Sequence, residues 1–99
     1  MTVRVFKLIN GEELISSSKM NIPGNAYLLE KPAVIMIQQT EQGVGVGVAP
    51  YMPYAQGEVT LYLSAIASEG LPDIKMENEY SRIFGSGIQL TASSVIAGL

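Results

Sequence analysis

The glycines of the segment GVGVGVAP (residues 43–50) are the first feature that could do chemistry, because glycine-rich loops bind the phosphates of nucleotides. A dinucleotide-binding loop needs the spacing G-x-G-x-x-G between a strand and a helix, and a P-loop needs Gly-Lys-Ser or Gly-Lys-Thr. The segment has neither pattern, and no helical pattern follows it. Strict alternation instead predicts a strand with one bare glycine face, whose other face packs on the core through Val44, Val46 and Val48.

The sequence contains few residues that could carry acid–base or metal chemistry. The 99 residues include no histidine and no cysteine, which removes the commonest general base, the thiolate nucleophile and two of the main metal ligands. Glu12 and Glu13 lie in a predicted turn, and Glu77 and Glu79 lie on different faces of a predicted helix, where solvated charges explain them. We therefore expect a protein that is not an enzyme and that uses no metal and no cofactor.

The composition indicates a small protein that covers itself poorly with polar surface. Charged residues make up 15% of the chain and hydrophobic residues 47%, with a net charge of -3. So few charges predict that apolar surface is buried against another copy of the chain. The six cations are spread along the sequence, which argues against strong binding to a phosphate backbone but leaves room for a small site based on stacking. They are Arg4, Lys7, Lys19, Lys31, Lys75 and Arg82.

No targeting segment is expected. The first residues, MTVRVFKLINGEE, lack the sustained apolar stretch of a signal peptide. No apolar run approaches the roughly 20 residues of a membrane helix. We therefore expect a soluble cytoplasmic protein without a membrane partner.

Residue patterns predict the elements that would position any site. β-Branched and aromatic residues predict a strand over residues 3–9, followed by an Asn-Gly turn and a return strand over 13–20. A long extended segment over 26–39 contains Pro32, so we expect a bulge, a bend or an edge position there, with residues 34–37 buried on both faces. Further strands are predicted over 44–51 and 59–69.

The end of the chain has a different pattern. Residues 73–84 predict a helix that starts at Asp73 and stops at Gly85, followed by a tail over 85–99 with a possible short strand at 88–90. The sequence thus predicts one mainly-β domain over residues 1–99. Its main part is a small, strongly bent, five-stranded barrel over about residues 3–69, followed by one C-terminal helix.

Several segments resemble the Sm/LSm family. VFKLINGEELISSS is similar to the family's opening hairpin, NAYLLEKPAVIM to its third strand, and VTLYLSAIASE to its second motif, two short strands hinged by a tight turn. GVGVAPYMPYA and NEYSRIFGSGI are also similar to segments of small Sm-like proteins of tailed bacteriophages. The resemblance covers about residues 3–69. It implies a bent barrel assembled into a closed homo-oligomeric ring, here in a phage-encoded protein inside a bacterial host.

The same resemblance implies a nucleic-acid site. The family stacks a base on the aromatic residue of an Asp-x-aromatic-x-Asn motif, and residues 25–29 read Asn-Ala-Tyr-Leu-Leu here. Tyr27 would therefore stack bases near the pore, supported by Asn25 and Ser64, with Lys31 as a nearby cation. The acid and the second asparagine of the motif are replaced, and Ser64-Ala65 stands where the family has Arg-Gly.

Two functions follow as expectations. The first is a ring that binds single-stranded RNA or DNA by base stacking, with a role in nucleic-acid processing. The alternative is a structural or adaptor ring with protein partners, as in a phage accessory protein, for which the loop PYMPYAQ (residues 50–56) would be an apolar contact surface. Tyr51, Tyr54 and Tyr62 are predicted to be packing or interface residues more often than stacking platforms.

Overall fold

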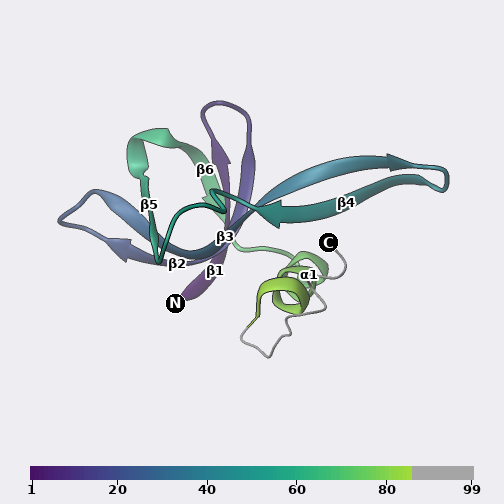
Figure 1. Ribbon diagram of the computed structural model, residues 1–99. Coiled ribbons are helices and arrows are strands. Elements are labelled where there is room, and N and C mark those ends of the chain that lie inside the picture. Colours follow the sequence, from purple (N-terminus) through teal and green to yellow (C-terminus); the bar gives the residue numbers. More distant parts are fainter. Residues whose placement is uncertain (86–99) are drawn as a thin grey trace.

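The structure is a computed structural model that describes residues 1–85 (Figure 1). It consists of one antiparallel sheet of six strands and a C-terminal helix. The predicted short strand at 88–90 and most of the predicted tail lie outside the described residues. The elements are β1 (Thr2–Leu8), β2 (Glu13–Asn21), β3 (Ala26–Thr40), β4 (Gly43–Pro50), β5 (Val59–Tyr62), the 3-10 helix η1 (Leu63–Ala65), β6 (Ile66–Gly70) and α1 (Ile74–Phe84).

The long strand β3 organises the sheet. The strand order is β4-β3-β2-β1-β6, and β5 pairs with β3 outside this path. The first half of β3 pairs with β5, with Ala26 opposite Tyr62. Its second half pairs with β4, from Ala33 opposite Pro50 to Thr40 opposite Gly43. The mainly-β class and the C-terminal helix are confirmed. The sheet has six strands rather than five, because the chain leaves β3 after β4 and returns to it as β5.

A bulge separates the two halves of β3. The register between β2 and β3 shifts between Ile15 and Ser17, and Lys31 has a φ of 54°, in the left-handed region that lysine rarely adopts. Pro32 follows directly and has no N–H to donate, while its carbonyl accepts from Tyr51 N at 2.8 Å. A bulge bends the strand and increases its twist. The predicted interruption at Pro32 is confirmed.

The two faces of the sheet build two clusters of buried side chains. Alternation along β1 sends Phe6 and Leu8 to one face and Val3 and Val5 to the other. The first cluster is formed by Phe6, Leu8, Leu14, Tyr27, Leu29, Val59 and Leu61. The second is formed by Ile15, Ala33 and Tyr80, with Val3, Val5, Ile35, Val48, Met76 and Phe84 packed against it.

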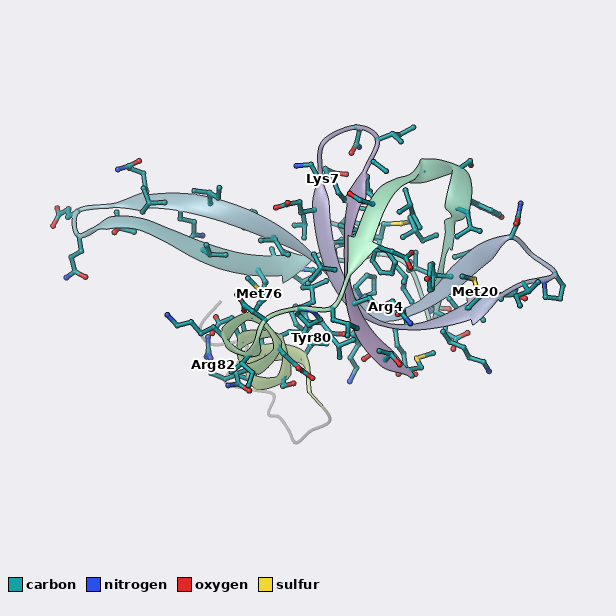
Figure 2. The ribbon with its side chains drawn as sticks, turned by 180° about the vertical axis from the view of Figure 1, so that it is seen from behind. Arg4, Lys7, Met20, Met76, Tyr80 and Arg82 are labelled. Carbon is teal, nitrogen blue, oxygen red and sulfur yellow. The ribbon has the colours of Figure 1, made fainter. Side chains whose placement is uncertain are left out.

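Helix α1 closes the second cluster. Asp73 is its N-cap and accepts from Met76 N at 2.8 Å, while the N–H of Gly85 donates to Ser81 O at 2.8 Å, so both predicted ends are confirmed. Tyr80 points from the helix to the sheet (Figure 2) and is 4% exposed. The helix therefore packs its apolar side on the face of the sheet opposite the first cluster.

The outer part of the β3–β4 hairpin extends away from the rest of the molecule (Figure 1). We call residues 36–47 the arm. Ile37 is 75% exposed, Val44 67% and Val46 52%. The prediction that the valine face packs on the core is wrong for Val44 and Val46, and only Val48 contacts the second cluster. Burial of residues 34–37 on both faces is likewise wrong for Met36 and Ile37, since no second layer covers this length of hairpin within residues 1–85.

Candidate functional site

Tyr27 occupies the interior of the first cluster. Its strand is paired on both sides, with Tyr27 opposite Met20 of β2 and Leu61 of β5. The side chain is 3% exposed, and its ring meets the ring of Phe6 edge-on at a centroid distance of 5.0 Å. The guanidinium carbon of Arg4 lies 5.7 Å from the centroid of the same ring, which is a cation–π contact. Tyr27 is thus enclosed by its own chain.

The hydroxyl of Tyr27 has a defined acceptor. It donates to Oε2 of Glu69 in β6 at 2.6 Å. Burial raises the pKa of the Tyr27 hydroxyl above its ordinary value of 10.0, the hydrogen bond and charge of Glu69 raise it further, and the Arg4 charge opposes them. The phenol is therefore protonated at neutral pH and joins β3 to β6. It has no character of a base or a nucleophile.

The other predicted site residues separate into two groups. Asn25 is exposed at the start of β3 with a φ of 57°, and its carbonyl accepts from Leu63 N at 3.0 Å. Ser64 follows Leu63 in η1 and is also exposed. The structure therefore brings Asn25 and Ser64 to the same end of β3 as Tyr27. Lys31 lies apart from them, at the bulge halfway along the strand.

The position of Tyr27 does not support the expected stacking site. A stacking platform must offer an open ring face to a base, whereas the ring of Tyr27 contacts Phe6 and Arg4 and is almost without exposure. The carboxylate of Glu69 next to its hydroxyl adds negative charge, which repels phosphate. Asn25, Ser64 and Lys31 remain exposed, but the ring of Tyr27 offers them no exposed face.

Sequence reasoning missed Arg4 and Glu69 as neighbours of Tyr27. By alternation, Arg4 shares a strand face with Phe6 and Leu8. Because that face packs on the core, the position of Arg4 beside the first cluster could have been predicted from the sequence. Glu69 lies 42 residues from Tyr27 in sequence. No local pattern reports a contact over that separation.

Open strand edges and exposed apolar side chains are the more prominent surface features. Within residues 1–85, β4, β5 and β6 each pair with a single other strand. Tyr54 is 98% exposed and Tyr62 59%, whereas Tyr51 packs against the first cluster. The other large apolar side chains that are exposed are Met1, Ile9, Met20, Ile22, Met36, Ile37, Val44, Val46, Met52, Leu71 and Ile74.

A groove of about 560 Å³ separates β4 from α1. It has Val46 and Met76 as apolar wall residues and carries charges of both signs. Its lining residues are Val46, Asp73, Lys75, Met76, Asn78, Glu79 and Arg82. Arg82 is already paired with Glu79, with a shortest distance of 2.7 Å. Over the described part of the chain, no three side chains of the metal-binding types come together as a site.

The surface of the described residues thus offers strand edges and apolar side chains rather than a reaction centre. Within residues 1–85, the α-helix α1 is too short and too polar to cross a membrane. Compared with known proteins, the chain matches no protein-family model and no curated sequence.

Proposed function

We propose that the chain is a non-enzymatic structural subunit that assembles with copies of itself into a closed ring and serves as an adaptor for protein partners. The observation that carries this proposal is a pair of strand edges, on β5 and β6 on either side of η1, that no other strand of residues 1–85 covers. An open edge presents unpaired N–H and C=O groups that another strand can bond. When the edge of β5 in one copy pairs with the edge of β6 in the next, the head-to-tail contact repeats until the ring closes.

The proposal includes an Sm-like barrel as the subunit fold. Strand β5 pairs with β3, β6 pairs with β1, and η1 joins the two strands directly. Two backbone hydrogen bonds hold η1 in place. They run from Leu63 N to Asn25 O at 3.0 Å and from Ile9 N to Ala65 O at 2.9 Å. The short strands hinged by a tight turn in VTLYLSAIASE have the arrangement that the Sm resemblance implies.

Protein partners are favoured over nucleic acid by the surroundings of Tyr27. The ring that would stack a base lies in the core beside Glu69, and the net charge of -3 opposes a phosphate backbone. Tyr54 instead stands fully exposed in the loop between β4 and β5. Aromatic side chains that are exposed in this way are typical of protein interfaces.

Native mass spectrometry of the full chain tests the ring, and fluorescence anisotropy tests the ligand. Tyr62→Lys places a charge on β5 beside its open edge and should dissociate the ring, whereas Tyr54→Lys makes the same change in the loop and should leave the mass unchanged. Short U-rich and A-rich oligonucleotides should give no anisotropy shift at low salt. A shift that disappears in Tyr27→Ala, in a variant that keeps its oligomeric mass, would instead establish binding of single strands.

A further inference from the structure

Strand β4 is a long open edge without the usual protection. It runs over Gly43–Pro50 in unbroken register with β3 and pairs with no other strand of residues 1–85. Natural proteins protect such edges with charges, prolines, bulges or short length. Between Lys31 and Glu58 the only charged residue is Glu41, which lies in the hairpin turn. Proline enters β4 only at its last position.

Gly45, in the middle of β4, is not required by this chain's own packing. A Cβ at Gly45 would meet no atom within 4 Å, and the φ of Gly45 lies outside the left-handed region. Glycine inside a strand weakens it and often marks the close approach of another backbone. Gly45 therefore lowers the stability of the strand in the isolated subunit, and no contact within residues 1–85 compensates for this loss.

The valine face of the arm continues the second cluster into solvent. Ile35 and Val48 pack against the cluster, and the next pair outward, Ile37 and Val46, is exposed together with Val44. An apolar strip that runs unbroken from a core to an exposed arm is typical of a protein interface. The strip lies on β3 and β4 and ends before the hairpin turn, so a second sheet joined at the edge of β4 would extend the strip without interruption.

The order of residues in β4 fits a second copy of the chain as the partner. Residues 44–48 read Val-Gly-Val-Gly-Val, which is the same in both directions. Two copies related by a two-fold axis at Val46 would therefore pair in antiparallel register, with every valine opposite a valine and every glycine opposite a glycine. A two-fold interface requires self-complementarity of this kind. The paired edges carry no charge that would repel.

We propose that β4 pairs edge to edge with β4 of a second copy, antiparallel and centred on Val46, so that the two sheets become continuous through their arms. This contact lies on an edge that the proposed ring does not use, and it goes beyond that function by joining two subunits of different rings.

The register also keeps the acidic turns of the two arms apart. It places Gly43 of the second copy opposite Ala49 of the first, so Glu41 of the second arm lies opposite Tyr51 of the first. The two Glu41 residues are thus separated by ten positions, about 33 Å along the strands, and their carboxylates do not repel each other.

Single cysteines test the register directly, because the chain has none of its own. In Val46→Cys the two introduced thiols face each other across the axis. Directly opposed residues have Cα atoms about 4.5–5.5 Å apart, which is within the range of roughly 4.4–6.8 Å that a disulfide needs. In Val44→Cys the register separates the thiols by four residues, about 13 Å along the strand. We expect mild oxidation of the full chain to give a covalent dimer with Val46→Cys and little with Val44→Cys.

Charge variants provide the second test. Val46→Lys and Val46→Glu should each halve the assembly mass through repulsion at the axis, and mixing the two variants should restore it. Ile22→Lys makes the same change at a residue that is 78% exposed in the β2–β3 turn and should leave the mass unchanged. The proposal is overturned if Val46→Cys forms no dimer, if Val44→Cys forms one as readily, or if the mixture stays dissociated. Because Tyr62→Lys acts on β5, loss of the ring and loss of the arm contact are distinguished by which variant changes the mass.

Discussion

Removal of one hydroxyl group, in Tyr80→Phe, should destabilise the protein measurably. The Tyr80 hydroxyl lies 2.9 Å from Lys31 O and 3.0 Å from Glu30 O, and it accepts from Ser17 N at 3.1 Å. These backbone groups flank the bulge, where β2 and β3 slip out of register. The hydroxyl of a helix residue thus contacts backbone groups of both strands at the bulge.

The expected magnitude follows from what the substitution leaves behind. Glu30 O also lies 3.0 Å from the Ser16 hydroxyl, whose single proton is shared with Ser17 O at 2.8 Å. Ser17 N and Lys31 O lose the partner that Tyr80 supplies. A hydrogen bond contributes a net ~1 kcal/mol, and a buried polar group left without a partner costs ~1–3 kcal/mol. Because these groups are only partly buried, we expect Tyr80→Phe to lower the free energy of unfolding by about 2 kcal/mol, which is roughly 10 °C in Tm for a chain of this size.

Urea unfolding followed by circular dichroism, at one fixed protein concentration, measures this change. Tyr54→Phe is the matched control, because the same atom is removed from a side chain that is 98% exposed, and its effect should stay within about 0.5 kcal/mol. If Tyr80→Phe is as stable as Tyr54→Phe, the hydroxyl does not satisfy the bulge and the reasoning fails.

Three further changes test other contacts. Tyr27→Phe tests the raised pKa: the folded chain holds this proton more tightly than the unfolded chain, so the stabilisation is complete below the ordinary pKa of 10.0 and is lost as pH rises through the folded value. Urea titrations from about pH 8 to about pH 11 should show a steeper loss for wild type than for the variant, and equal slopes would contradict the assignment. Phe6→Ala should cost ~3–5 kcal/mol, because Phe6 is fully buried against Tyr27. Asp73→Ala should cost ~0.5–2 kcal/mol through loss of the N-cap bond to Met76, and circular dichroism should show less helix. An unchanged melting curve would count against either of these two assignments.

Features that depend on neighbours in sequence were predictable. Asn10-Gly11 forms the turn between β1 and β2, with Gly11 at a φ of 96°, because few residues other than glycine adopt this conformation readily. Pro32 forces a bulge because it lacks a donor, and Asp73 caps a helix because its carboxylate reaches the N–H three residues on. Each of these effects is complete within a few residues.

Features that depend on the presence of another layer were not predictable. Alternation in GVGVGV states that two faces differ, but it does not state whether anything packs on the valine face, so the exposure of Val44 and Val46 required the structure. The Sm resemblance implies an accessible Tyr27 that stacks bases near the pore. The burial of Tyr27 arises from Phe6 on another strand and from Glu69 at a distance of 42 residues, which a local pattern does not contain.

The mass of the full chain in solution tests the central claim most directly. Sedimentation velocity or native mass spectrometry at micromolar concentration should find one discrete assembly, whose mass is a whole multiple of the chain mass and falls when Tyr62 is changed to Lys. A single species of monomer mass across that concentration range would contradict the proposed ring.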